Sequence, residues 1–206
     1  MTSGIEKPIG RRRGEETRER LTEAASAVFA RAGFERATVD EIVREAGFSK
    51  GAFYVHFESK EDLFWSMLEE RINRHQEAFR DTVDHDNTVA ENVRMILTAV
   101  FGLAQADPLW SSLFMEFSAH AGRNEKARRL LAGMYERWRE SVVSILEAGR
   151  AAGRIREDID TKFIATVIVA AVEGSIMQAL LAPDTVRLRE MTEPLARTLS
   201  EWLEAA

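Results

Sequence analysis

The sequence contains no cysteine and only four prolines among its 206 residues. Without cysteine, the chain can form neither a disulfide framework nor a thiolate metal site, and it has no thiol nucleophile. This absence suits a reducing compartment, so we expect a cytoplasmic protein. No long run alternates apolar and polar residues as a strand would, and helix-forming residues dominate. The sequence therefore predicts an all-α fold.

The motifs of common enzyme classes are also missing. There is no Gly-rich phosphate loop, nucleophile elbow or HExxH pattern. Glu116 and His120 have i, i+4 spacing and could share a metal ion, but no Glu-x-x-His pair accompanies them. We expect no catalytic residue, no metal and no cofactor. A helical-bundle enzyme is the alternative to a binding protein.

The chain has no excess of basic residues, since its net charge is −6. Residues 1–62 carry 11 Lys/Arg and 12 Asp/Glu, whereas the remainder carries 17 and 22. The N-terminal part is thus nearly neutral and the rest is acidic. If the protein binds nucleic acid, its affinity must come from where the cations lie rather than from total charge.

The stretch TVDEIVREAGFSKGAFYVHF, residues 38–57, carries the signals of two short helices. Thr38 and Glu41 can form a capping box at the start of the first helix, and Gly47 can end it. Ser49 can then cap the second helix. Two short helices joined by a glycine-containing turn predict a helix-turn-helix, whose second helix enters a DNA major groove. A plain helical hairpin within a bundle is the alternative.

The second of these helices has two different sides. Its spacing places Phe53 and Phe57 on one side, whereas Gly51 and Tyr54 point the other way and Lys50 lies on the flank. No acidic residue occupies its first turn, so its N–H groups are free to meet phosphate. Glycine costs about 1 kcal/mol relative to alanine inside a helix, and close approach to DNA would explain its presence.

The flanking residues complete a family pattern. An apolar stripe over residues 21–32 predicts a preceding helix that ends at Gly33, and an apolar helix follows the SKEDLF segment. The segments GFERATVDEI and SKGAFYVHFESKEDLF resemble the DNA-binding domain of the TetR family of transcriptional regulators, over about residues 16–68. The resemblance implies an N-terminal three-helix helix-turn-helix domain joined to a C-terminal helical ligand-binding and dimerisation domain. It also implies a repressor that leaves a pseudo-palindromic double-stranded DNA operator when a small-molecule effector binds.

The same resemblance assigns roles on the DNA. Lys50 and Gly51 would lie at the groove, and Tyr54 would contact the phosphate backbone. Thr38 and Lys60, which start the flanking helices, would each bond a phosphate. The predicted DNA-binding residues are Thr38, Ser49, Lys50, Gly51, Ala52, Tyr54, His56 and Lys60.

Two of these positions need comment. Ala52 stands where threonine is frequent in the family, which removes a possible hydroxyl contact to DNA. His56 would contact a phosphate, but a packing or capping histidine is an equally open interpretation.

Three domains are predicted. Residues 1–14 read as a flexible basic arm, residues 15–62 as the DNA-binding domain, and residues 63–206 as the helical ligand-binding and dimerisation domain. Arg11–Arg13 in the arm could reach a minor groove, or the arm could be a solvated tail.

The last two predicted helices are the most apolar part of the chain. Residues 163–182 are apolar almost all round, and the final helix is expected from about Thr192, with Pro194 in its first turn. Glu173 and the lack of basic flanks argue against a membrane span. We expect these helices to pair two copies of the chain into a homodimer. The apolar stripe of the last helix consists of Leu195, Leu199, Trp202 and Leu203.

The middle helices offer residues for an effector pocket, although core packing is the alternative for each of them. Glu173 is the only charge in its helix and needs a partner, either in the dimer interface or on a polar or cationic ligand. The Tyr135 hydroxyl could also fix the polar end of a ligand. A ligand-independent DNA-binding scaffold is the alternative for the whole domain. The candidate ligand residues are Phe101, Trp110, Phe114, Phe117, Met134, Trp138, Glu173 and Met177.

Overall fold

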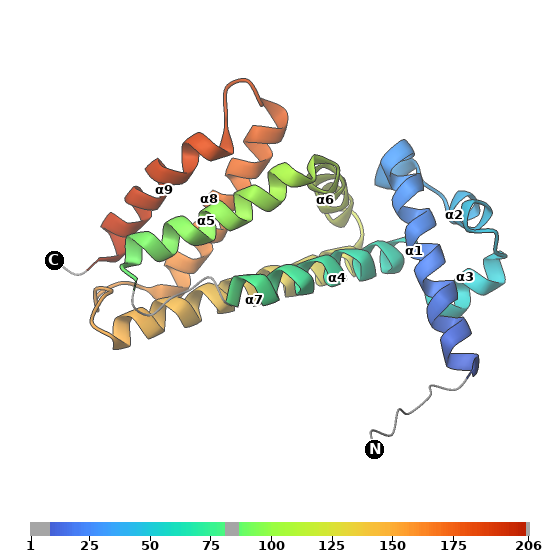
Figure 1. The fold of residues 1–206 in the computed structure, drawn as a ribbon, viewed down its shortest axis with the longest axis horizontal. Coiled ribbons are helices and arrows are strands. Elements are labelled where there is room, and N and C mark those ends of the chain that lie inside the picture. Colours follow the sequence, from blue (N-terminus) through green and yellow to red (C-terminus); the bar gives the residue numbers. More distant parts are fainter. Residues whose placement is uncertain (1–8, 81–86, 205–206) are drawn as a thin grey trace, which may run out of the picture. The chain divides into compact units, whose positions relative to one another are not determined.

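The computed structural model describes residues 9–80 and 87–204, and the regular elements in this part of the chain are nine α-helices (Figure 1). This architecture confirms the predicted all-α fold. The chain divides into two compact units, Met1–Ile72 and Asn73–Ala206. The helices are α1 (Ile9–Arg36), α2 (Val39–Ala46), α3 (Lys50–His56), α4 (Lys60–Arg80), α5 (Val89–Ala106), α6 (Pro108–Ala121), α7 (Glu125–Ala151), α8 (Thr161–Leu181) and α9 (Leu188–Leu203).

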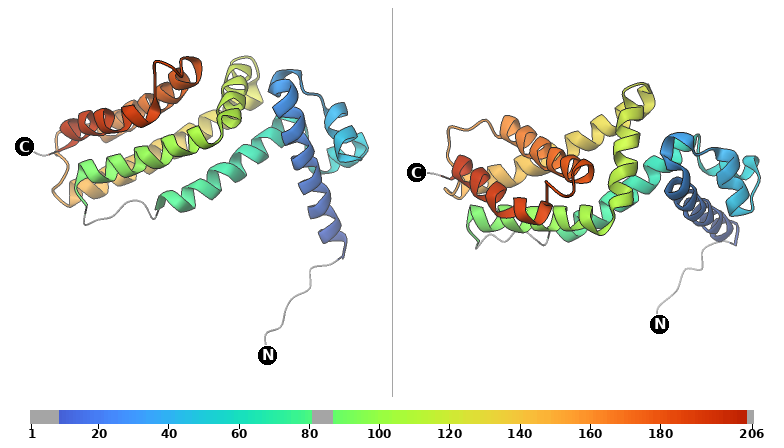
Figure 2. Two further views of the ribbon diagram at one scale, coloured as in Figure 1. Left: turned by 45° about the horizontal axis from the view of Figure 1, so that its top comes forward. Right: turned by 90° about the horizontal axis from the view of Figure 1, so that it is seen from above.

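A core of phenylalanine rings holds the first unit together. Phe29 and Phe34 from α1 lie 5.5 and 5.0 Å from the ring of Phe64 in α4, measured between ring centroids. Phe53 of α3 is fully buried as well, and Figure 2 shows α2 and α3 beside α1. Because α4 supplies part of this core, the unit ends within α4, whereas the sequence placed the domain boundary after residue 62.

Helix α1 starts earlier than the sequence suggested. It begins at Ile9, so residues 9–14 are helical and do not form the predicted flexible arm, and Arg11–Arg13 lie in its first turns. The predicted arm over residues 1–8 lies outside the described residues. Near its other end, Gly33 has φ 76° and ψ 168°, a conformation that breaks the helix at the residue expected to end it.

In the second unit, α5 and α9 pack against each other, and α8 lies beside them (Figures 1 and 2). The centre of this contact is a cluster of buried side chains to which α8 adds partly buried aliphatic residues such as Ile168 and Val172. Helices α6, α7 and α8 pack together on another side of the unit. The buried members of the α5–α9 cluster are Leu97, Phe101, Leu188, Ala196 and Leu199.

The last helix differs from its prediction. It begins at Leu188, so Pro194 lies inside the helix rather than in its first turn. Arg187 makes no side-chain capping hydrogen bond there. The start is instead held by packing, because Leu188 is only 4% exposed within the α5–α9 cluster. A sequence pattern that relies on caps cannot find such a start.

By its length and composition alone, helix α8 could cross a bilayer. A core helix of a soluble protein can have the same length and composition, so this is weak evidence for a membrane span. It packs against α5, α6, α7 and α9. Large apolar side chains nevertheless remain exposed on it: Phe163 is 63%, Met177 is 44% and Leu181 is 70% exposed. Part of the apolar surface of α8 is therefore left uncovered within one chain.

Candidate DNA-binding surface and effector site

Helix α3 presents one side to the core and the other to solvent. The hydroxyl of Ser49 accepts a hydrogen bond from the Ala52 N–H at 3.2 Å, which caps the helix as predicted. Phe53 is fully buried, whereas Tyr54 and Val55 are 56% and 79% exposed. The side of the helix that carries Tyr54 is therefore available to a partner.

The flank of this exposed side carries an ion pair that the sequence did not reveal. Nζ of Lys50, the first residue of α3, lies 2.8 Å from Oδ1 of Asp40 in the first turn of α2. The hydrogen bond with Asp40 is the main reason why the pKa of Lys50 is raised. The candidate groove-facing lysine therefore has a carboxylate partner in the DNA-free chain. The only signal for this contact is a Lys and an Asp ten positions apart, which is too common to be informative.

The Thr38 cap is satisfied within the chain. The Thr38 hydroxyl donates to Oε2 of Glu41 at 2.8 Å and accepts from the Glu41 N–H at 3.2 Å, while the Thr38 N–H donates to the same carboxylate at 2.9 Å. These bonds confirm the predicted capping box, and they hold the pKa of Glu41 below its usual value. A phosphate at Thr38 would have to take the place of the Glu41 carboxylate.

Lys60 has a structural role that the sequence did not predict. Its ammonium donates hydrogen bonds to the carbonyl oxygens of Phe34 at 2.8 Å, Glu35 at 3.1 Å and Ala37 at 3.0 Å. It also lies 4.5 Å from the centroid of the Phe34 ring. These bonds use the three ammonium protons that a phosphate contact would need. Lys60 therefore ties α4 to the end of α1, and we leave it out of the DNA-binding surface.

Arg20 secures the turn of the helix-turn-helix in a similar way. Its guanidinium donates to the Ala46 carbonyl at the end of α2, at 2.9 Å, and lies 4.8 Å from the Phe48 ring centroid. Gly47, between these residues, has φ 73° and ψ 30°, the left-handed conformation expected of it. Arg20 positions the turn, and the sequence pattern did not point to it because its partners are far along the chain.

The remaining predicted DNA residues lie on or near α3. Gly51 is exposed, and Ala52 and His56 are half-buried. A Cβ atom added to Gly14 of α1 would lie 3.7 Å from the His56 ring, so His56 lies between the end of α3 and α1. This position is compatible with both interpretations of the histidine.

In the second unit, four side chains from three helices form one group. The Tyr135 hydroxyl of α7 donates a hydrogen bond to the Glu173 carboxylate of α8. The Tyr135 ring meets Trp138 edge-on at 5.5 Å, and Trp138 lies 6.4 Å from Phe114 of α6. Burial and the bond to Glu173 raise the pKa of Tyr135 far above its usual value, so it stays a hydroxyl donor. Glu173 thus has the partner that a charge in an apolar helix requires.

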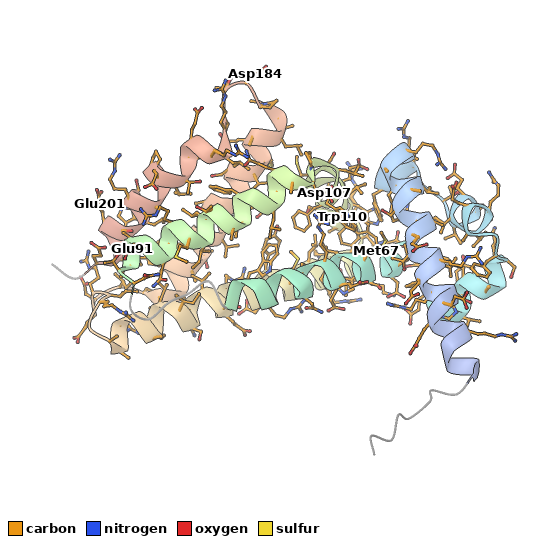
Figure 3. All side chains as sticks on the ribbon, in the orientation of Figure 1. Met67, Glu91, Asp107, Trp110, Asp184 and Glu201 are labelled. Carbon is orange, nitrogen blue, oxygen red and sulfur yellow. The ribbon has the colours of Figure 1, made fainter. Side chains whose placement is uncertain are left out.

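The other candidate ligand residues differ in burial. Phe101 belongs to the α5–α9 cluster, and Phe117 and Met134 are fully buried. Met177 is 44% exposed, and Trp110, in the first turns of α6, is half-buried (Figure 3). The structure therefore joins Phe114, Trp138 and Glu173 of the predicted set.

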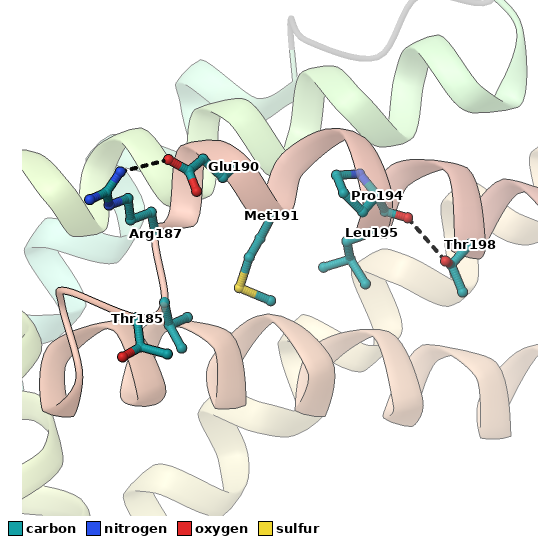
Figure 4. A pocket seen from close by; sticks show the side chains of 8 residues that line it. Thr185, Arg187, Glu190, Met191, Pro194, Leu195 and Thr198 are labelled. Atoms are coloured by element: carbon teal, nitrogen blue, oxygen red, sulfur yellow. Dashed lines mark hydrogen bonds and ion pairs between the residues drawn. The ribbon is translucent and has the colours of Figure 1, made fainter.

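A groove of about 410 Å³ lies along the start of α9, and none of the candidate ligand residues lines it. Figure 4 shows Met191 and Leu195 pointing into it from α9, with an ion pair between Arg187 and Glu190 at one end. The Thr198 hydroxyl donates to the Pro194 carbonyl at 3.0 Å. The lining residues are Thr185, Val186, Arg187, Glu190, Met191, Pro194, Leu195 and Thr198.

A three-helix unit that exposes one side of a short second helix, followed by a larger helical unit, defines a DNA-binding transcriptional regulator of the helix-turn-helix class. The family models agree with this class. The model of bacterial regulatory proteins of the TetR family matches residues 21–67, and that of the C-terminal domain of BetI-type transcriptional repressors matches residues 89–204. The chain belongs to the TetR family of transcriptional regulators.

Individual relatives span nearly the whole chain. The transcriptional repressor DhaR of a Mycobacterium species is 26% identical over 91% of both chains. FadR of Bacillus subtilis, solved in complex with stearoyl-CoA, shares the fold at 19% identity, with a TM-score of 0.76 over 89% of this chain and 98% of its own. A regulator from Saccharomonospora viridis, solved with choline, shares it at 21% identity, with a TM-score of 0.76 over 93% and 100%.

Proposed function

We propose that this TetR-family regulator acts in the cytoplasm as a homodimer, that it represses from a pseudo-palindromic operator, and that a small molecule bound near Glu173 releases it. The observation that carries the DNA-binding part is the exposed side of α3. Tyr54 and Val55 are exposed there while Phe53 anchors the helix in the core, and no acidic residue occupies the first turn. A short helix held in this way can enter a major groove without disturbing its own fold.

The proposed dimer uses α8 and α9. Phe163, Met177 and Leu181 of α8 and Trp202 of α9 are between 44% and 70% exposed. Soluble proteins seldom leave several large apolar side chains in water unless a partner covers them. Pairing of α8 and α9 with their copies would bury these residues and would place two α3 helices on one DNA, which predicts an operator of two half-sites.

Leu199 does not belong to this proposed interface. The sequence placed it on the stripe that would meet the partner chain, but it is 2% exposed and packs in the α5–α9 cluster. A charged substitution at Leu199 would therefore disrupt the fold of one chain rather than test the dimer. Trp202, which is 46% exposed on the same helix, is the appropriate residue for that test.

The effector site proposed here is the group formed by Phe114, Trp138, Tyr135 and Glu173. Aromatic rings next to a carboxylate favour a cation, because ring faces and the carboxylate both attract positive charge. The negative charge of an acyl-CoA fits this group less well. The choline bound by the Saccharomonospora viridis regulator supports a quaternary ammonium or amine as the first class to test.

Release would act through α4. This helix runs from Lys60 to Arg80, across the limit between the two units at Ile72. Two recognition helices must match successive major grooves about 34–36 Å apart, so a small movement of α4 in each chain would break their register. An effector achieves this only if it binds the released form more tightly, and the operator must then weaken effector binding by the same factor.

One experiment tests the whole proposal. The full chain is used to select binding sites from random double-stranded DNA, and quaternary ammonium compounds, amines and acyl-CoA are then screened for release from the selected site. We expect a two-fold symmetric site and release by a cation. A selected site that no compound class releases would support a ligand-independent scaffold, and a chain that enriches no sequence would reopen the enzyme interpretation.

A further inference from the structure

The ion pair between Asp40 and Lys50 joins the starts of α2 and α3 on the exposed side of the first unit. The two charged atoms are 2.8 Å apart, and each side chain is 57% exposed. Water screens an exposed pair of this kind, so it contributes little to stability. The small gain in stability therefore does not explain why a carboxylate lies beside the lysine at the proposed DNA surface.

A carboxylate in this position acts against attraction to the DNA backbone. Phosphates are negatively charged, so they repel Asp40, and Asp40 also neutralises Lys50. If this surface contacted only the phosphates of DNA, its affinity for DNA would be higher without Asp40. The edge of a base pair is a different partner, because it presents hydrogen-bond acceptors and donors side by side in the major groove.

The spacing of the ion pair matches the edge of a G·C base pair. Guanine presents the acceptors O6 and N7, and cytosine presents the N4 amino group as a donor. Since O6 accepts a hydrogen bond from N4 within the base pair, these two atoms are about 2.9 Å apart. The 2.8 Å between Lys50 Nζ and Asp40 Oδ1 places a donor and an acceptor at the same separation. An A·T pair also offers a neighbouring donor and acceptor, but its donor, adenine N6, lies between the two acceptors N7 and O4, so a carboxylate bonded to N6 would face a second acceptor.

We propose that Asp40 is a specificity-determining residue that reads one G·C base pair together with Lys50. This inference rests on the proposed function, because it needs α3 to enter the major groove. In the free protein the two side chains satisfy each other. At a matching site Lys50 donates to guanine and Asp40 accepts from the cytosine amino group. At an A·T pair the Asp40 carboxylate faces a second acceptor beside the donor, and this repulsion disfavours binding.

The test uses the full chain and selection from random double-stranded DNA. The variants are Asp40→Ala, Asp40→Asn and, as a matched control, Glu45→Gln. Glu45 also lies on α2 and pairs with a cation, Arg31, at 3.2 Å, so its substitution removes the same charge from the same helix. Far-ultraviolet circular dichroism and thermal unfolding check that each exposed substitution leaves the fold intact.

The wild-type chain should select a site with a fixed G·C pair in each half. Asp40→Ala should lose discrimination at that pair by about ten-fold, the effect of one good base contact. Asp40→Asn should shift the preference towards A·T, because an amide pairs with adenine through two hydrogen bonds. Glu45→Gln should select the wild-type site.

Three results would overturn the inference or its basis. If both Asp40 variants select the wild-type site and change affinity equally for all DNA, Asp40 acts only through its charge and does not read a base. If the position that depends on Asp40 is an A·T pair, the assignment to G·C is incorrect. If the wild-type chain enriches no sequence, the proposed function itself fails, which separates that failure from a failure of the inference.

Discussion

The first unit completes its core within one chain, whereas helix α8 of the second unit leaves large apolar side chains in water. Phe29, Phe53 and Phe64 are fully buried, but Phe163 and Leu181 are 63% and 70% exposed. The core of the first unit is therefore covered by its own helices. In the proposed dimer a partner would cover α8 and stabilise the second unit further, so its stability should depend on protein concentration. Four experiments test this difference between the two units.

The largest effect is expected from Leu199→Ala, because this residue belongs to the core of one chain. The substitution should lower the free energy of unfolding by about 2–5 kcal/mol, as for other buried leucines. Urea unfolding followed by circular dichroism measures this loss. Trp202→Ala, at a 46% exposed position on the same helix, should cost much less at protein concentrations where the chain is monomeric. Equal losses would mean that α9 has no distinct inner and outer sides.

Lys60→Ala should have the next largest effect, since it removes the hydrogen bonds from the ammonium group to three carbonyl oxygens. Hydrogen bonds to a charged group contribute about 1.5–3 kcal/mol each, and partial exposure reduces the sum, so we expect a loss of about 2 kcal/mol. Urea unfolding again provides the measurement. Lys50→Ala, which breaks one exposed ion pair, is the control and should change stability by less than about 1 kcal/mol. Wild-type stability of Lys60→Ala with weaker binding to every DNA would instead support a phosphate contact.

Phe163→Ser and Leu181→Ser should weaken the proposed dimer without unfolding the chain. Each removes an exposed apolar side chain, and we expect the dimer dissociation constant to rise about ten-fold, equivalent to about 1.4 kcal/mol. Sedimentation equilibrium measures the constant. Leu109→Ser is the matched control, because Leu109 is 39% exposed but lies on α6. If the control weakens the dimer as much as the α8 variants do, the interface is not on α8.

The smallest effect concerns acid stability. The hydrogen bonds from Thr38 lower the pKa of Glu41 below 4.5, its value in an unfolded chain. The stabilisation from this carboxylate is therefore complete above pH 4.5 and is lost as the pH falls through the lowered pKa. Glu41→Gln cannot titrate, so the stability difference between wild type and variant should shrink on acidification below pH 4.5. Thermal unfolding between pH 3 and 7 gives this difference, and a constant value would show that folding does not lower the pKa of Glu41.

Local signals in the sequence predicted the first unit well. The capping box at Thr38, the left-handed Gly47 and the Ser49 cap each depend on residues within a few positions of one another. In the second unit, Thr88 and Asp160 cap their helices in the same local way. A side chain and a backbone N–H three residues apart must meet once a helix forms, so the pattern is sufficient.

Contacts between distant residues were not predictable in this way. Lys60 and Arg20 bond carbonyl oxygens more than twenty residues away, and any carbonyl at the end of a helix could have been the acceptor. Leu199 and Trp202 belong to the same apolar stripe in the sequence. Leu199 is buried and Trp202 is exposed because only one side of α9 packs against α5. In the predicted effector set, Phe114, Trp138 and Glu173 come together because α6, α7 and α8 meet, which helical periodicity alone does not specify.

The bonds of Lys60 to three carbonyl oxygens also bear on how the operator complex responds to ionic strength. Each phosphate that a protein neutralises releases condensed counterions, and the logarithm of the affinity falls with the logarithm of the salt concentration by about 0.9 per phosphate. An ammonium group whose three protons are bonded to backbone carbonyls makes no direct contact with a phosphate, and no counterions leave the DNA through such a contact. The proposed dimer would carry two such lysines and should therefore show a slope about 1.8 shallower than a dimer in which both lysines contact phosphate. Its occupancy of the operator would vary correspondingly less when the salt concentration of the cell changes.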